Sequence, residues 1–294
     1  METRWLYVTS EELEQLRDKT GGVCVIPYGA VEKHGLHMPL GTDILQAEYY
    51  AYEASKIEPV CVFPGIPFGD MSCGHPTTAP GIISIPMATN FLLLEQLCDQ
   101  IGRYGFHKIL LVTGHGGNFA WLTAFLEQLG SKKKNYVVAS TYVALKTNVI
   151  YNLAKFLEAN GPGSIPELTA EDEALVLKFW REKIPSGHGC LGETALVMAA
   201  APESVKLDRL GIESGKSRHV SDKFAAAGIE IRDDGWYEDY PTNYAAEVDP
   251  VDANERIGKA AARFEAERIA NAYKVFKEDE NLLKWLFEKQ KGWN

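Results

Sequence analysis

The first half of the chain alternates between two patterns of hydrophobic residues. Short, continuous apolar runs, typical of strands buried on both faces, occur at residues 23–28, 60–63, 108–112 and 136–140. Between these runs, apolar residues recur at helical spacing over residues 10–16, 43–55, 88–104 and 120–129. Because strands alternate with helices, the pattern predicts an α/β fold with a mostly parallel sheet that is covered by helices on both faces.

The second half of the chain is more helical. Its spacing predicts helices at residues 145–157, 170–180, 194–201, 254–276 and 279–291. From about residue 203 to residue 249 the pattern weakens into charged residues, glycines and an aromatic cluster at 236–240. We interpret this part as an irregular excursion near the site or at a subunit contact, and expect the aromatic cluster to pack between subunits rather than to wall a pocket. No repeat or low-complexity linker divides the chain, so we predict one domain over residues 1–294.

Composition restricts the partners and the compartment. A formal net charge of −10 argues against nucleic acid or an anionic membrane as a main partner. No apolar run approaches the roughly 20 residues that span a bilayer. The first residues lack the basic-then-apolar order of a signal peptide, so we expect a cytoplasmic protein. The five cysteines form no Cys-x-x-Cys pair, which argues against a disulfide framework or a structural zinc site.

Two polar loops follow predicted strands and could hold a metal. Residues 32–43 place Glu32, His34 and Asp43 in one loop after the strand at 23–28. His115 lies in a glycine-rich loop after the strand at 108–112. In parallel sheets, ligands bind where strands end, so we expect both loops to meet at one rim. Mixed imidazole and carboxylate ligands suit a borderline divalent metal such as zinc, manganese or iron(II).

Four further side chains are candidates for the same rim. His188 and Glu193 precede an apolar helix, where they could supply an acid or base and a carboxylate; alternatively, Glu193 is only a favourable charge in a first helical turn. His75, in a loop rich in glycine and proline, could contact the substrate or serve its loop structurally. Asn118 is a second candidate for a polar residue that contacts the substrate. His37 is expected to hydrogen-bond within its own loop and to orient a ligand.

Three ordered segments resemble the signatures of the creatininase (creatinine amidohydrolase) family. They are residues 32–43, 113–118 and 188–194, and the similarity runs from about residue 22 to 201 and resumes at 249–262. The resemblance implies a three-layer αβα sandwich, assembly as a homo-oligomer (commonly a hexamer) and a hydrolytic site with two divalent metal ions.

The resemblance also implies roles for individual residues. Glu32 and His115 would bind one metal, His34 would bind the other, and Asp43 would bridge them. His188 matches the family's catalytic histidine, which would pass a proton to the departing group.

Two departures from the family pattern concern the second metal and the substrate. Creatininase has a glutamate two residues after its motif histidine, whereas this chain has Gly117; Glu193 or a water would complete that metal's coordination. The tryptophans that enclose creatinine have no counterparts around residues 164 and 184, so the sequence does not favour creatinine itself.

The resulting hypothesis is a metal-dependent hydrolase that opens a small cyclic substrate by attack of metal-bound hydroxide on a carbonyl. Cleavage of a cyclic amide C–N bond is the family default. The alternative is hydrolytic C–C ring opening of a cyclic keto-polyol of the diketo-inositol type. A second alternative, from another class, is a non-catalytic protein that binds metal or a small molecule.

Overall fold

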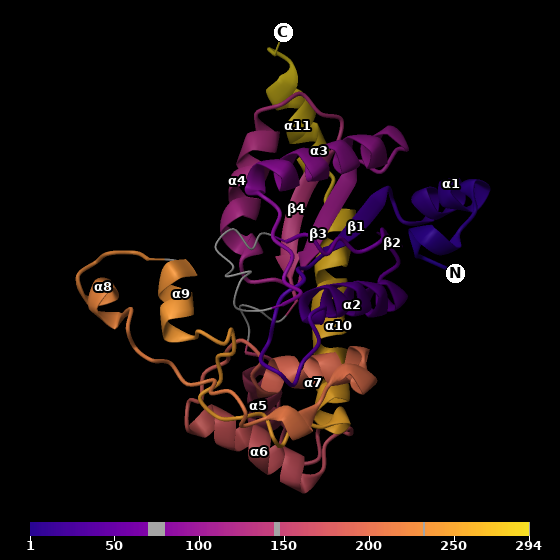
Figure 1. Cartoon of the computed structure of the whole chain (residues 1–294). Helices are drawn as coiled ribbons and strands as arrows, with labels where there is room; N and C mark the ends of the chain where they lie inside the picture. Colours follow the sequence, from indigo (N-terminus) through magenta and orange to yellow (C-terminus); the bar gives the residue numbers. More distant parts are fainter. Residues whose placement is uncertain (70–79, 144–147, 232, 294) are drawn as a thin grey trace.

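The computed structural model describes residues 1–69, 80–143, 148–231 and 233–293. Within these ranges, one parallel sheet has the strand order β2-β1-β3-β4 (Figure 1). The strands are β1 (Val23–Tyr28), β2 (Cys61–Val62), β3 (Lys108–Thr113) and β4 (Val137–Tyr142). All four correspond to predicted apolar runs, so the predicted parallel sheet is confirmed.

The two central strands run in register for their whole length. β1 pairs with β3 from Val23 opposite Lys108 to Tyr28 opposite Thr113. Every residue of both strands is buried, as their continuous apolar sequences predict. Because the two strands end at the same level, the loops that follow them leave the sheet side by side.

Helices cover both faces of the sheet. Val25 and Leu110 face a core with helices from both halves of the chain: α2 (Thr42–Ile57), α5 (Val149–Asn160), α6 (Ala170–Arg181), α7 (Leu191–Ala200) and α10 (Glu255–Glu278). Ile26 and Leu111 face the opposite core, with α1 (Ser10–Lys19), α3 (Met87–Arg103) and α4 (Asn118–Gly130). The predicted three-layer αβα sandwich is confirmed. Since both cores share one sheet, we continue to interpret the chain as a single domain.

One of two helix starts agrees with the pattern in the sequence. Helix α1 begins at Ser10, as predicted, and its capping residue is Thr9, whose hydroxyl accepts from the amide of Glu12 while the Glu12 carboxylate accepts from the amide of Thr9. Helix α7 begins at Leu191 rather than at residue 194, which puts Glu193 in its first turn.

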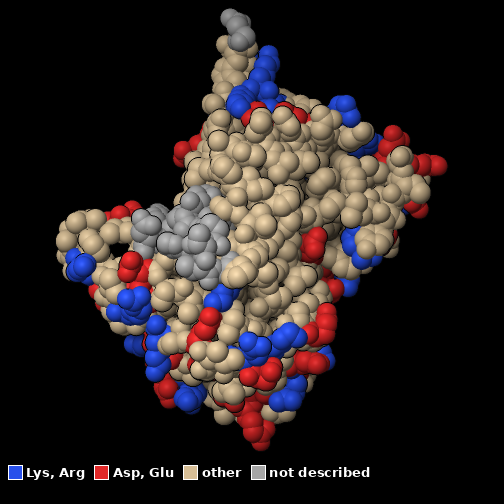
Figure 2. Space-filling model, in the orientation of Figure 1, with Lys and Arg blue, Asp and Glu red and all other residues tan. Residues whose placement is uncertain are grey.

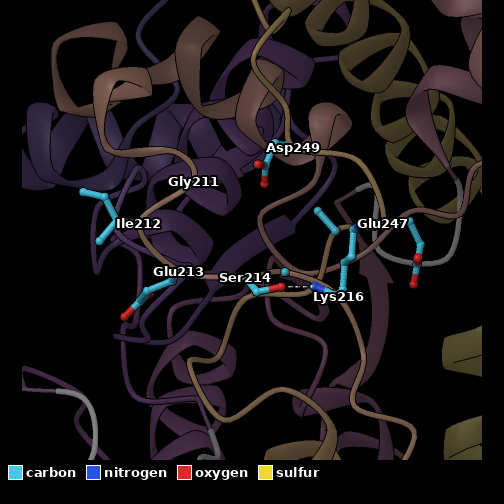
Figure 3. Close-up of a pocket in the computed structure, with 9 residues that line it drawn as sticks. Gly211, Ile212, Glu213, Ser214, Lys216, Glu247 and Asp249 are labelled. Carbon is cyan, nitrogen blue, oxygen red and sulfur yellow. Dashed lines mark hydrogen bonds between the residues drawn. The ribbon is translucent and has the colours of Figure 1, made fainter.

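The excursion at 203–249 is irregular, as predicted. It contains only short helical pieces among its described residues: η3 (Leu207–Arg209), α8 (Asp222–Ala226) and α9 (Asp233–Asp239), after η2 (Pro202–Ser204). Figure 1 shows α8 and α9 on an arm that projects from the body. A pocket of about 350 Å³, lined by residues of 211–216 and by Ala246, Glu247 and Asp249, lies on this excursion (Figure 3).

Short helices lie at both ends of the chain. The N-terminal η1 (Trp5–Tyr7) precedes α1, and the C-terminal α11 (Asn281–Gln290) leaves Trp285 and Phe287 exposed. On the face in Figure 2, basic residues are interspersed with acidic ones over the lower part of the molecule. None of the described helices is both long and apolar enough to cross a bilayer.

Candidate metal centre

The candidate centre lies where β1 and β3 end. The loop after β1 carries Glu32 and His34 and leads to Asp43, the second residue of α2, while His115 follows β3. All four side chains are buried, with relative exposures of 1–5%. The two loops therefore bring their polar groups together at one rim of the sheet.

Two glycines allow this close approach. A Cβ atom on Gly29 would overlap the backbone of Ile44, and one on Gly114 would overlap the backbone oxygen of Asp43. By contrast, a Cβ on Gly116 would have nothing within 4 Å. The first turn of α2 can thus lie directly against the ends of both strands because Gly29 and Gly114 have no side chains.

Three groups of described side chains could hold a metal ion: Glu32 with His34 and His188, and two adjacent groups that share Asp43. In the first of the two that share Asp43, His115 Nδ1 lies 3.1 Å from Glu32 Oε2 and 3.0 Å from Asp43 Oδ2. In the second, His34 Nε2 lies 3.2 Å from Asp43 Oδ1 and 3.6 Å from Glu193 Oε1. Within each group the potential ligand atoms are all within 4.8 Å of one another. Asp43 offers a different oxygen to each of the two groups that share it.

Three buried atoms in these groups fit a metal site. Glu32 Oε2, His34 Nε2 and Asp43 Oδ2 make no well-formed hydrogen bond to a described residue, and their near neighbours are other groups of the cluster at 3.0–3.2 Å. Buried polar atoms are nearly always hydrogen-bonded, because leaving one without a partner costs about 1–3 kcal/mol. Imidazole nitrogen and carboxylate oxygen are also ligands that zinc, manganese and iron accept. The residues present therefore fit divalent cations at this position.

The protonation states of the cluster follow from burial and mutual charge. Burial by itself would raise the pKa of Glu32 and Asp43, yet the neighbouring imidazoles hold the pKa of both carboxyls below the usual range. Burial would likewise lower the pKa of His34, but Asp43, Glu193 and Glu32 outweigh it and raise that pKa to about 10. The pKa of His115 is raised for the same reason, by Glu32 and Asp43. Without metal, protons on the two imidazoles balance the carboxylates.

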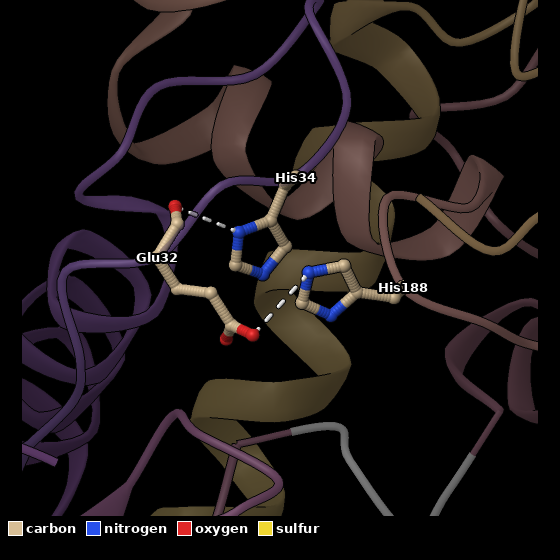
Figure 4. A group of neighbouring side chains, drawn as sticks. All are labelled: Glu32, His34 and His188. Atoms are coloured by element: carbon tan, nitrogen blue, oxygen red, sulfur yellow. Dashed lines mark hydrogen bonds and ion pairs between the residues drawn. The ribbon is translucent and has the colours of Figure 1, made fainter. Parts of the chain in front are cut away.

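The third predicted segment reaches the same place. Glu193, in the first turn of α7, accepts a hydrogen bond from the Gly189 amide at Oε2 (2.6 Å), while its Oε1 faces His34. His188 stacks on the His34 ring, with centroids 3.8 Å apart and an interplanar angle of 15°. Its Nε2 lies 2.8 Å from the carbonyl oxygen of Lys33. The same atom lies 3.8 Å from Glu32 Oε1 (Figure 4). Both interpretations of Glu193 are compatible with this place, since it is a first-turn charge that also points into the cluster.

We had expected His37 to hydrogen-bond within its own loop. Instead, its side chain contacts a distant segment of the chain. Its Nε2 lies 3.1 Å from the Gly189 oxygen and 3.2 Å from the Thr194 hydroxyl. Burial is the main cause that lowers the pKa of His37 to about 4, so the ring is neutral near neutral pH. The contact fixes the loop that carries His34 against the segment that carries His188.

The two predicted substrate residues have different outcomes. Asn118 is fully buried; its amide donates to the Thr113 hydroxyl (2.9 Å) and accepts from the Trp121 indole (3.0 Å). These contacts hold the start of α4 beneath the His115 loop, and substrate contact by Asn118 stays a prediction. His75 lies outside the described residues.

The sequence analysis missed one residue at the centre. Asn243 donates from its amide to Glu32 Oε1 at 2.9 Å. The Trp236 ring lies edge-on to His188, with centroids 5.7 Å apart, and packing of its aromatic cluster between subunits stays a prediction. The aromatic cluster gave a signal for Trp236, whereas nothing around Asn243 distinguishes it from any other turn asparagine.

Two known proteins are similar to this chain in sequence. A creatinine amidohydrolase from Pseudomonas putida is 25% identical over 191 residues, which are 64% of this chain and 68% of that protein. A mycofactocin precursor peptide peptidase from Mycolicibacterium smegmatis is 32% identical over 106 residues, which are 34% of this chain and 42% of that protein.

Solved structures agree on the fold. Two creatininases, one described as a zinc–zinc type and the other as a manganese form, each match 95% of this chain and 100% of their own with a TM-score of 0.67, at 20% and 19% identity. The profile of the creatininase family, described as creatinine amidohydrolase, matches residues 7–273. This chain therefore belongs to the creatininase family, whose members are hydrolases.

Proposed function

We propose that this protein is a two-metal hydrolase that opens a small cyclic substrate at a carbonyl group, with a cyclic amide as the family's default substrate. The observation that carries the proposal is the position of Asp43. Its two carboxylate oxygens face two separate ligand groups, 3.0 Å from His115 and 3.2 Å from His34. A carboxylate shared in this way is the expected bridge between two cations.

Each proposed metal position has three protein ligands. Glu32, Asp43 and His115 would hold one cation, and His34, Asp43 and Glu193 would hold the other. Gly117 cannot supply the carboxylate that the family pattern has there, and Glu193 Oε1 faces His34 in addition to the shared Asp43. We therefore favour Glu193 over a water molecule for this position. Zinc and manganese are the first metals to test because creatininases of this fold carry those names, with iron as the third.

The reaction combines metal chemistry with proton transfer by His188. Two divalent cations held here would lower the pKa of a water molecule and polarise a substrate carbonyl. Because the Lys33 carbonyl can only accept, His188 Nε2 carries the proton of their 2.8 Å hydrogen bond. This leaves Nδ1 as the ring nitrogen that would pass a proton to the departing group. Glu32 and Asp43, held ionised, supply the negative charge that retains the cations.

The surroundings of the centre bear on the substrate. Ile184, near the position of a creatinine-enclosing tryptophan in the namesake enzyme, packs against the core beside the sheet. Described side chains beside the cluster include His188, Asn243 and Trp236. This polar wall with one aromatic ring keeps the keto-polyol ring, opened by hydrolytic C–C cleavage, as the second candidate. Both reactions need the same carbonyl attack, so the metal ligands do not separate them.

The experiment is a substrate screen with protein of measured metal content. Zinc- or manganese-loaded enzyme is incubated with cyclic amides, with oxidised inositols, and with short peptides because one relative is a peptidase. Turnover of cyclic amides supports the first candidate, and turnover of oxidised inositols supports the second. A protein that binds two equivalents of metal but turns over none of these classes would contradict the hydrolase proposal and support the non-catalytic alternative.

His188→Ala is the matched test of the proton-transfer role. Loss of a positioned acid–base group costs roughly 10²–10⁴-fold in rate. We expect that loss in kcat with two equivalents of metal retained, since His188 is assigned to neither ligand group. An unchanged rate would remove His188 from the mechanism.

A further inference from the structure

The end of the excursion passes between the metal loop and the segment that carries His188. Ala245 donates its amide to the His188 carbonyl at 2.8 Å, and Gly35 donates its amide to the Asn243 carbonyl at 3.2 Å. Asn243 itself is only 2% exposed and lies in the left-handed region, with φ of 50°. Asparagine tolerates that conformation better than most residues, but a glycine would adopt it with less strain. The asparagine side chain therefore calls for an explanation of its own.

The two polar atoms of the Asn243 side chain are fully used at the centre. Nδ2 donates to Glu32 Oε1 and to the Lys33 carbonyl, both at 2.9 Å, and Oδ1 accepts from Trp236 Nε1 at 2.7 Å. The indole N–H can only donate, so Oδ1 must face Trp236 and Nδ2 must face Glu32. Trp236 thus fixes which way the amide points.

The two carboxylate oxygens of Glu32 face different partners, Asn243 and His115. Oε1 is taken by Asn243, while Oε2 is the buried oxygen that makes no well-formed hydrogen bond to a described residue and that lies 3.1 Å from His115 Nδ1. A donor that binds Oε1 restricts rotation of the Glu32 carboxylate and so fixes the direction in which Oε2 points. Hydrogen bonds of this kind to metal ligands are worth about 10–100-fold in metal affinity or activity.

The side-chain amide of Asn243 also shares a hydrogen-bond acceptor with His188, the proposed acid–base group. The Lys33 carbonyl accepts from both Asn243 Nδ2 and His188 Nε2, at 2.9 and 2.8 Å. The Trp236 ring that holds the Asn243 amide also packs edge-on against His188. One side chain is therefore bonded to a metal ligand and shares an acceptor with the proposed acid–base group.

We propose that Asn243 is a positioning residue that orients Glu32 toward one of the two metals, and that Trp236 acts through it by fixing the amide. The proposal rests on the two-metal function proposed above. It concerns the ligand group of Glu32, Asp43 and His115, and leaves the group of His34, Asp43 and Glu193 with its own contacts. Removing the amide should therefore affect one metal much more than the other.

The test compares Asn243→Asp, Asn243→Gly and Thr242→Ala. The aspartate keeps the shape of the side chain but, when ionised, cannot donate to Glu32. The glycine keeps the left-handed backbone and removes the side chain. Thr242 is the adjacent residue; its hydroxyl bonds the Ser214 carbonyl and not the metal loop, so its variant is the matched control.

The main readout is Zn²⁺ affinity, measured by chelator competition, and it does not depend on activity. For both Asn243 variants we expect one zinc equivalent to bind 10–100-fold more weakly, with the other equivalent changed less than threefold. For Thr242→Ala both equivalents should be unchanged. Trp236→Phe, which loses only the N–H donor, should shift the same equivalent in the same direction by a smaller factor. With an active substrate, kcat should fall further than KM rises.

Several outcomes would overturn the inference. If Asn243→Gly binds both equivalents like the wild type, Asn243 does not orient Glu32, whatever its melting temperature. If both equivalents weaken equally, its role is general support of the fold. If the wild type binds two zinc ions but hydrolyses nothing, the proposed function fails, while the zinc affinities still decide the role of Asn243.

Discussion

The rim of the sheet and the excursion at 203–249 contribute to the same centre by different means. At the rim, side chains follow two paired strands, so the register of β1 with β3 sets where Glu32 and His115 begin. The excursion has only short helices among its described residues, and it contributes Asn243 and Trp236 through side-chain hydrogen bonds. The comparison suggests the division we propose: regular structure places the proposed ligands, whereas an irregular segment hydrogen-bonds to one of them. The following predictions test this division, from the largest expected effect to the smallest.

The largest effect is expected from Asp43→Ala. This change removes a ligand oxygen from both groups at once, so both metal equivalents and the activity should be lost. Elemental analysis of the purified variant is the measurement. Asp43→Asn, which keeps the volume, controls for the cavity; retention of two equivalents by either variant would end the bridging assignment.

A clash at the rim should be the next most damaging change. Gly114→Ala would press a methyl group into the Asp43 carbonyl, and we expect it to cost about 1–3 kcal/mol of unfolding free energy and to weaken metal binding. Gly116→Ala, two residues away with open space around it, should change stability by less than about 0.5 kcal/mol. Urea denaturation of both variants tests the pair, and equal stabilities would show that the close approach is not needed.

The charge balance of the rim predicts how metal binding depends on pH. The pKa of His34 is raised to about 10 in the metal-free cluster, and the pKa of His115 is also raised, whereas a ligand imidazole must be unprotonated. Each metal must therefore displace protons near neutral pH, and affinity should rise with pH by about tenfold per unit for each proton displaced. For the metal bound by His34 this rise should level off near pH 10.

Calorimetry in buffers of different ionisation enthalpy measures this proton release directly. His219, which is exposed and far from both ligand groups in the chain, offers His219→Ala as a control that should not alter the release. Metal binding without proton release would contradict the protonated state of both imidazoles.

The smallest expected effect is on stability, from breaking an ion pair between the rim loop and the excursion. Lys33, between two ligands, forms a 2.7 Å ion pair with Glu213 of the excursion, and the two side chains are 13% and 22% exposed. Lys33→Met should cost about 1 kcal/mol, compared with about 0–0.5 kcal/mol for Lys259→Met, whose pair with Glu255 is mostly exposed. Thermal unfolding of both variants tests this difference; no difference would mean that this pair does not anchor the excursion.

Much of the fold could be predicted from the sequence because its strands are continuous apolar runs. The segment 23–28 was predicted with its observed ends, and the other three strands and the main helices were shifted by a few residues. The approach of His34, Asp43 and His115 followed from one rule, that loops after neighbouring parallel strands share an edge. Helix starts were less predictable in one case: α7 begins at Leu191, three residues before the start that the apolar spacing predicts.

Asn243 and Trp236 could not be predicted in the same way. Asn243 lies 211 residues from Glu32 in the chain, in a segment without periodicity, and its contact depends on a single turn with positive φ. His37 shows the same limit: its partners, Gly189 and Thr194, lie more than 150 residues away. The hexamer and the cytoplasmic location also remain predictions.

Two of the proposed ligands, Asp43 and Glu193, occupy the first turns of α2 and α7. The free N–H groups and the positive dipole end of a helix favour negative charge at that position. The carboxylates are thus accommodated before any cation arrives. We therefore expect the chain to fold first and to acquire its ions afterwards, so that a chelator should remove the ions without unfolding the protein.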